Sequence, residues 1–537
     1  MSLSSNCRIP SVSVAAALKS CADQCIPPPE VLEAIFEDLA GPYAFVPAMD
    51  RSRSGDAMTM QETREVRSSL ISAALTCKGF CSTALDVLWR KINNLTPLLR
   101  LLPSFKVLDK PYFFSGPISS EDWARFDFYA CRVHTVAYLP IPGSMEIHPS
   151  VYTAVSVLHS APILPNLRSV TFPCTMTLMP NVLPEVILLV GPTVRHVELA
   201  QALHISIVPT VITALAGTSP QLSSLVLYAH TSSALEDALA SFPDLESLEL
   251  TDIPDSISLG LFASISTLRR LHTLALPIPS STLVNSTLSL PVDPFSALKS
   301  LRILSGPSEG MNRFLAWIPS GVLRSLDISY HWGFQTTQSS IDDIFQSISH
   351  RWASSLQRLD LYGFPSLSRE HCRLLLNLRN LHSFRVRNMV MPICATDLPD
   401  LIAAWPEMRS LCIPSMPRLP INSLHHFAEK SQSLKYLEVT LSTSDISPCT
   451  TTLLSTHPLQ TLHIADSPCP AADLNIISLH LDRLFPHLRS LNARGSDERR
   501  WAKVEGLIFA FQDVRMQVGT HTRTSCARTR KRGSSAR

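Results

Sequence analysis

Leu245-Glu246-Ser247-Leu248-Glu249-Leu250 has leucine at its first, fourth and sixth positions. This alternation predicts a short strand with Leu248 and Leu250 on one face and Ser247 and Glu249 on the other. The same apolar spacing occurs thirteen times, starting at residues 167, 194, 222, 245, 271, 298, 323, 356, 381, 408, 434, 459 and 488. The mean interval is about 27 residues, which is typical of stacked repeats rather than of a globule with one cleft.

Helical segments separate the predicted strands. In residues 233–242, the side chains of Leu235, Ala238, Leu239 and Phe242 fall on one helical face. A single strand with its helix cannot bury its apolar face, whereas stacked neighbours bury it jointly. The predicted fold class is therefore α/β: a leucine-rich-repeat solenoid with a curved parallel sheet and outer helices. A leucine-rich α/β domain without stacking is the alternative.

A small helical module is predicted in front of the repeats, over residues 26–104. Its first segment, residues 26–39, opens with prolines, which suit a helix N-terminus because they lack an N–H that would be unpaired there. Apolar residues follow at helical spacing: Val31, Leu32, Ile35, Phe36 and Leu39. We expect residues 40–68 to form a long internal loop, with a helical stretch around residues 61–67 as an alternative, and residues 70–89 to form a second helical block.

The two ends of the chain differ from the repeats. We expect residues 1–25 to be a disordered leader, and residues 496–513 to form a closing helix with Trp501, Val504 and Ile508 among its apolar positions. Residues 514–537 contain seven basic residues and no acidic one. Their cluster at 528–532 matches a nuclear localisation signal or a nucleic-acid arm, but such clusters are common in disordered ends, and we favour a disordered basic tail.

Composition narrows the functional class. Charged residues make up 17% of the chain and the formal net charge is +2, which gives no electrostatic case for a nucleic-acid or membrane partner. The thirteen cysteines are scattered without zinc-site spacing, so we expect a reducing compartment, the cytoplasm or the nucleus. No apolar run approaches the roughly 18 residues of a membrane span.

Catalytic motifs are missing from the sequence. It has no HExxH, GxSxG, GxxxxGK or GxGxxG pattern, and its paired histidines, His425 and His426, are adjacent, which keeps them off a common helical face. We therefore expect no enzyme activity, no catalytic residue, no cofactor and no metal site. The repeats favour a protein that holds a partner.

The module and the repeats together resemble F-box proteins of the leucine-rich-repeat type, especially the large fungal set. Residues 28–39 (PPEVLEAIFEDL) are similar to the first F-box helix, residues 75–80 (LTCKGF) to its middle, and residues 85–90 (LDVLWR) to its final turn. The resemblance implies a helical module that docks on the Skp adaptor, which links it to the cullin and RING subunits of an SCF-type ubiquitin ligase. The repeats, residues 105–513 with their closing helix, would then hold the protein to be ubiquitinated.

The resemblance also implies which residues meet the adaptor or pack the module. They are Pro28, Glu30, Leu32, Ile35, Leu39, Leu75, Phe80, Leu88 and Trp89. The repeats depart from the family in lacking the Asn or Cys three residues after the third apolar position, where Phe364 and Ser442 stand here, so we expect less regular turns. The alternative function is a leucine-rich-repeat interaction scaffold with no ubiquitin-ligase role, in which the module only caps the array.

Overall fold

The computed structural model describes residues 27–40, 60–107, 111–138, 147–159, 162–172, 182–199, 208–228, 233–251, 257–278, 293–330, 338–365, 367–444, 446, 455–495 and 497–533. The expected leader, residues 1–25, and residues 41–59 of the expected internal loop lie outside this set. The chain divides into two compact units, Met1–Ala229 and His230–Arg537. Among the described helices, none is both long and apolar enough to cross a lipid bilayer.

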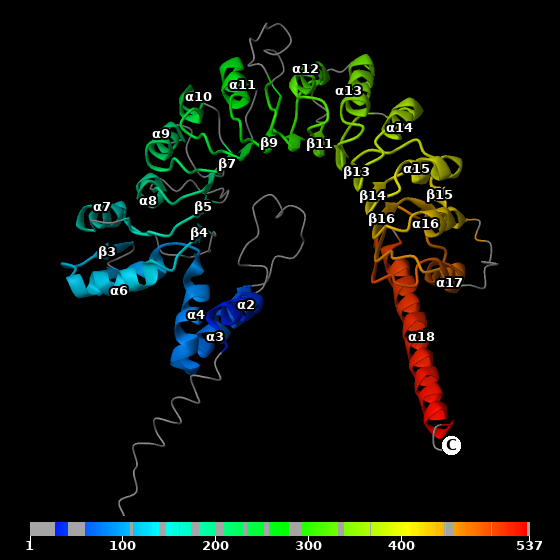
Figure 1. Cartoon of the computed structure of the whole chain (residues 1–537), viewed down its shortest axis with the longest axis horizontal. Coiled ribbons are helices and arrows are strands. Elements are labelled where there is room, and N and C mark those ends of the chain that lie inside the picture. The colour runs from blue at the N-terminus through cyan, green and yellow to red at the C-terminus, as the bar shows by residue number, and fades with distance from the viewer. Residues whose placement is uncertain are drawn as a thin grey trace, which may run out of the picture. The chain divides into compact units, whose positions relative to one another are not determined.

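The first unit begins with a three-helix head (Figure 1), made of α2 (Pro29–Ala40), α3 (Met60–Thr76) and α4 (Lys78–Arg90). The helices share a buried core of Leu32, Phe36, Leu70, Ala74, Ala84 and Val87. Phe80 packs edge-on against Phe36, with ring centroids 5.9 Å apart. Arg90 forms ion pairs with Glu33 and Glu37, which hold α4 to α2.

The block over residues 70–89 is helical, as expected, and consists of two helices, because Cys77 adopts an extended backbone (φ −156°, ψ 163°) between α3 and α4. The expected loop is shorter than predicted. The internal loop ends before residue 68, because α3 already begins at Met60. Packing explains the earlier start: Val66 lies against the head core, so the additional helical turns bury apolar surface.

The repeats of the first unit form a parallel ladder in the order β1-β4-β5-β6-β7. Its strands are β1 (Lys91–Ile92), β4 (Thr135–Ala137), β5 (Ser169–Phe172), β6 (His196–Leu199) and β7 (Ser224–Leu227). The helices are α5 (Thr96–Leu99), α6 (Ser120–Ala130), α7 (Pro149–Leu158), α8 (Val182–Leu189) and α9 (Val208–Thr218), and β2 (Phe105–Val107) pairs antiparallel with β3 (Tyr112–Phe114). Because β1 pairs with β4, the array starts inside residues 26–104 and not at residue 105.

The second unit has a ladder of the same kind, in the order β8-β9-β10-β11-β12-β13-β14-β16-β18-β19. Its strands are β8 (Ser247–Leu250), β9 (Thr273–Leu276), β10 (Ser300–Ile303), β11 (Ser325–Ser329), β12 (Arg358–Tyr362), β13 (Ser383–Arg387), β14 (Ser410–Ile413), β16 (Tyr436–Val439), β18 (Thr461–Ala465) and β19 (Ser490–Arg494). Its helices before the last are α10 (Ser233–Leu239), α11 (Leu259–Ser266), α12 (Ser308–Trp317), α13 (Gln338–Arg351), α14 (Arg369–Leu375), α15 (Leu398–Ala404), α16 (His425–Lys430) and α17 (Leu474–Leu484). Helices α11 to α15 lie on one side of these strands (Figure 1), and we call the other side the open face.

All thirteen predicted strands are present, and each begins two residues after its motif start. Leu248 and Leu250 are fully buried, as the alternation predicts, and Leu245 is fully buried as well. The buried rows also match between neighbours, since Leu248 is the register partner of Leu274, and Leu274 is the register partner of Leu301. The prediction of an α/β leucine-rich-repeat solenoid is confirmed.

Backbone conformation, rather than a ladder of Asn side chains, shapes several turns of the second unit. Four residues with positive φ directly follow a strand: Gly363, Asn388, Asp466 and Gly495. The N–H of Gly363 donates to the carbonyl of Arg387 at 3.0 Å, which extends the ladder by one bond. Phe364, at the position of the missing Asn, is buried against the rings of Tyr330 and Phe345, at centroid distances of 5.6 and 5.7 Å.

The second unit closes with α18 (Glu498–Gly533). Trp501, Val504 and Ile508 are buried, as expected for a closing helix. Arg515 donates to both carboxylate oxygens of Asp482, at 2.5 and 2.7 Å, and fixes α18 to α17. The helix continues through residues 514–533, where the sequence predicts a disordered basic tail. A helix that docked residues have nucleated propagates at little cost.

We predict that Gly363→Ala destabilises the second unit. The added Cβ would lie too close to the carbonyl oxygen of Tyr330, and L side chains rarely adopt the φ of +72° found here. We expect a loss of about 2–4 kcal/mol in the free energy of unfolding, measured by chemical denaturation. Gly321→Ala is the control, because Gly321 has a similar φ of +76° but open space around its Cβ, and it should lose only about 1 kcal/mol. Equal losses would contradict the clash.

Candidate functional site

Helix α2 of the head is apolar on two faces. Val31, Ile35 and Leu39 recur every four residues and are exposed, whereas Leu32 and Phe36 are buried in the head core. Residues spaced by four lie on the same side of a helix. The helix therefore presents one apolar stripe to the core and a second one to solvent.

Helix α3 carries a second exposed stripe, formed by Ile71 and Leu75. Leu75 is 81% exposed, the highest value among the large hydrophobic side chains that the structure describes. Helices α2 and α3 pack against each other. We call Val31, Ile35, Leu39, Ile71 and Leu75 the head surface. Exposed apolar side chains on two packed helices are typical of surfaces that bind another molecule.

Burial divides the nine predicted adaptor-binding residues into groups. The exposed ones are Pro28, Glu30, Ile35, Leu39 and Leu75. Leu32 is only 3% exposed and belongs to the module core, and Phe80 and Leu88 are half-buried side chains that pack against it. The adaptor contacts of the predicted residues stay a prediction.

Trp89, the ninth of these residues, connects the head to the first repeats. Its ring lies 4.8 Å from the ring of Tyr129 on α6. Next to it, Arg132 forms a 2.8 Å salt bridge with Asp86 of α4. Together with the pairing of β1 and β4, these contacts build the head into the end of the ladder. Trp89 therefore packs the head against the first repeats.

The open face of the second unit carries two rows of mostly polar residues. The first strand position holds a hydroxyl residue in most repeats: Ser247, Thr273, Ser300, Ser325, Ser383, Ser410, Thr461 and Ser490. The third position forms a row in register: Glu249, Ala275, Arg302, Asp327, Asp360, Arg385, Cys412, Glu438, His463 and Asn492. The signal for the first row in the sequence is a Ser or Thr two residues after the motif start. The second row has no common residue type, so the sequence alone does not reveal it.

Opposite charges meet within the second row. Arg302 lies 3.5 Å from both Glu249 and Asp327. Burial raises the pKa of Asp327 to about 6, with the neighbouring Asp360 adding to the rise and Arg302 opposing it. Burial likewise raises the pKa of Glu249, against the effect of Arg302. The row is therefore a partly desolvated set of charges held in fixed positions.

The row offers no nucleophile with an adjacent base. Cys412 is buried, and burial together with the nearby Glu438 raises the pKa of its thiol to about 12. Glu438 stands between Cys412 and His463 in the ladder. Burial acts to raise the pKa of Glu438, but hydrogen bonds from His463 and Tyr436 outweigh it and lower that pKa to about 2. A protonated thiol without a neighbouring imidazole is a poor nucleophile. Within the described residues, no group of His, Cys, Asp and Glu is arranged to hold a metal ion.

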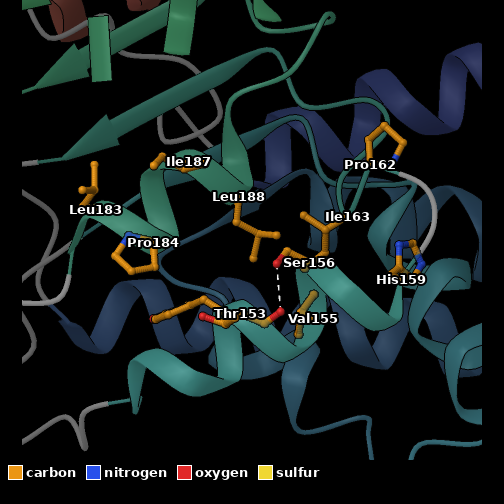
Figure 2. Close-up of a pocket in the computed structure, with 11 residues that line it drawn as sticks. Thr153, Val155, Ser156, His159, Pro162, Ile163, Leu183, Pro184, Ile187 and Leu188 are labelled. Carbon is orange, nitrogen blue, oxygen red and sulfur yellow. Dashed lines mark hydrogen bonds between the residues drawn. The ribbon is translucent and has the colours of Figure 1, made fainter. Parts of the chain in front are cut away.

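Figure 2 shows a pocket of about 420 Å³ between α7 and α8, lined mainly by apolar side chains. Polar groups of its described lining are engaged within the fold. The Ser156 hydroxyl donates to the Thr153 carbonyl at 2.8 Å, and His159 Nε2 lies 3.0 Å from the Asp127 carboxylate. A specific small-molecule site needs polar groups that converge on the ligand. The pocket therefore has an apolar surface but offers few polar groups that could orient a ligand.

Tyr152, which also lines this pocket, belongs to a buried hydrogen-bonded group around the carboxyl of Glu185. Glu185 of α8 accepts hydrogen bonds from the hydroxyls of Tyr138 and Tyr152. Tyr138 in turn stacks on Phe172 at a centroid distance of 4.5 Å. Burial raises the pKa of Glu185 to about 7, although both tyrosine hydrogen bonds act to lower it. This carboxyl group is a packed part of the core whose ionisation costs stability.

No protein-family model matches the chain, and no curated protein matches it. Several solved structures match at low identity. A leucine-rich-repeat protein of Leptospira interrogans is 13% identical, with 74% of this chain and 99% of that chain covered and a TM-score of 0.31. A Bacteroides fragilis protein is 14% identical over 46% of this chain and 74% of its own, with a TM-score of 0.32. The yeast Rad7 and Elc1 complex matches at 13% identity over 86% of this chain and 94% of the matched chain, with a TM-score of 0.33. Similarity at this level supports no argument about function.

We predict that Glu185 makes stability depend on pH. Its folded-state pKa of about 7 lies above the ordinary value of 4.5, so its contribution is fully present below pH 4.5 and is lost as the pH rises through 7. Glu185→Gln stays neutral at every pH. The difference in the free energy of unfolding between the variant and wild type should therefore shift in favour of the variant by about 1–3 kcal/mol from about pH 4 to about pH 8.5. Chemical denaturation at both values measures the gain, and a difference that does not change with pH would contradict it.

Proposed function

We propose that this protein is the substrate-recognition subunit of an SCF-type ubiquitin ligase. In this proposal the head binds a Skp adaptor and the repeats hold a target protein. The observation that carries it is the head surface: five apolar side chains remain exposed on α2 and α3, where the sequence resembles an F-box. A Skp adaptor with a complementary apolar groove would bury this apolar area. Each Å² removed from water would contribute about 25 cal/mol to the free energy of binding.

The chain itself supplies no catalytic group in this proposal. The adaptor connects the head to cullin and RING subunits, which bring the ubiquitin-transfer chemistry, in the cytoplasm or the nucleus. The contacts of Trp89 with Tyr129 and of Asp86 with Arg132 support a firm connection between the adaptor site and the first repeats. A firm connection keeps a bound target at a constant distance from the transfer machinery, which raises the effective concentration of the reacting groups.

A second candidate function is an interaction scaffold in which the head is only an N-terminal cap. The pairing of β1 with β4 favours it, because the residues just after α4 already extend the ladder and cover its first edge. Terminal repeats of a solenoid need such a cap for solubility. The two candidates differ in one respect, since a cap needs no exposed apolar stripe and binds no adaptor.

We predict that Ile35→Asp combined with Leu75→Asp prevents adaptor binding without unfolding the head. Both side chains lie outside the head core, so a charge there disturbs the interface and spares the packing. A pull-down of the full chain with a Skp adaptor, followed by isothermal titration, should show wild-type binding and a loss of more than about 30-fold in the variant.

Val157→Asp is the matched control for this experiment. Val157 is a 76% exposed apolar residue on α7, away from the head helices, so its substitution adds the same charge without touching the head surface. Its binding should equal that of wild type. Wild-type protein that does not bind the adaptor, or a double variant that binds it unchanged, would refute the ubiquitin-ligase proposal and leave the scaffold function.

A further inference from the structure

Arginines gather on the open face of β12 and β13. Arg358, Asp360 and Tyr362 alternate with buried leucines on β12, and Arg385 and Arg387 flank a buried valine on β13, so all five side chains leave the same face. Asp360 is the register partner of Arg385, and Tyr362 is the register partner of Arg387. Two guanidinium groups, those of Arg358 and Arg387, therefore lie near one carboxylate, and Arg385 leaves the same face from the register position opposite it. We call Arg358, Arg385 and Arg387 the arginine cluster.

Asp360 positions two of these arginines without occupying most of their donors. Its side chain is 3% exposed, and its Oδ2 lies 3.2 Å from Arg358 and 3.8 Å from Arg387. Both distances exceed the roughly 2.7–2.9 Å of a strong charged hydrogen bond. Each guanidinium has five N–H donors, and the Arg387 side chain is 47% exposed. The cluster thus keeps both positive charge and hydrogen-bonding capacity for another molecule.

Arg385 provides an independent observation. Its Nε is buried and has no hydrogen-bond partner among the described residues. A buried donor without a partner is costly, and an anionic oxygen from a bound molecule would satisfy it. On the β14 side of Arg385, the next acid of the row is Glu438, which is not available for this purpose. Glu438 already accepts a hydrogen bond from Tyr436 at 2.8 Å and lies 3.3 Å from His463.

We propose that the arginine cluster binds an acidic peptide segment, whose carboxylate or phosphate groups lie over β12 and β13. Arginine recognises both anions through paired hydrogen bonds. The exposed ring of Tyr362 beside Arg387 offers the kind of aromatic contact that is enriched in binding hot spots. The inference rests on the proposed function only in identifying this peptide as part of the target protein.

Fluorescence anisotropy with the full chain tests this proposal. Three labelled peptides of equal length are compared: a glutamate-rich one, one with phosphoserines, and a lysine-rich one. The two acidic peptides should bind saturably, and more weakly as salt is added, whereas the lysine-rich peptide should not bind. The ratio of the two acidic affinities distinguishes carboxylate from phosphate recognition.

Variants locate the binding site. Arg385→Ala combined with Arg387→Ala should weaken acidic-peptide binding by about tenfold or more. Arg373→Ala removes the same kind of charge from an exposed side chain on α14 and should leave binding unchanged. If the double variant fails to fold by circular dichroism, Arg387→Ala alone serves, because this side chain is half exposed and should still lose several-fold in affinity.

Two outcomes would overturn the proposal: folded variants that bind as well as wild type, or acidic peptides that show no saturable binding. A single-stranded oligonucleotide that binds more tightly than either acidic peptide, with the same dependence on Arg387, would overturn the assignment to a peptide. The assay contains no adaptor. Failure here and failure of adaptor binding by the head are therefore separate results.

Discussion

The sharing of apolar surface between neighbouring repeats is the constraint on which the rest of the structure depends. A unit such as β8 with α11 cannot enclose Leu248 and Leu250 by itself, so each strand needs a parallel neighbour with leucines in the same register. This requirement fixes the spacing of the motif and the direction of the strands in the parallel ladder. It also means that the two ends need special covers, which the head and α18 provide.

The same constraint creates the polar surface. Because alternate residues of each strand are committed to the core, the residues between them must leave the opposite face, whatever their chemistry. Stacking then places residues from distant parts of the chain next to each other, such as Asp360 and Arg385. Burial on this face penalises the ionised form of its acids, as the raised pKa of Asp327 indicates. The outward residues of a repeat fold can therefore vary to recognise a partner while the buried residues of the core stay the same.

The head shows a different balance between packing and recognition. Its core is small, and α2 uses one apolar stripe to build it while a second stripe remains exposed. Stability alone does not require Ile35 and Leu75 to be apolar, because neither belongs to that core. Trp89, in contrast, packs against Tyr129 and so connects the head to the repeats. Adjacent positions on short helices therefore serve different purposes.

The apolar spacing along the chain was enough to predict the fold class, the positions of all thirteen strands and the closing helix, because the periodicity of core residues is a local property of each segment. It was not enough to separate Leu32 from Ile35, or to find the helix break at Cys77, because burial on a short helix depends on which neighbours pack against it. The arginine cluster was likewise hidden, since its members come from different repeats. Strand register, which is set between repeats rather than within them, is what brings those side chains together.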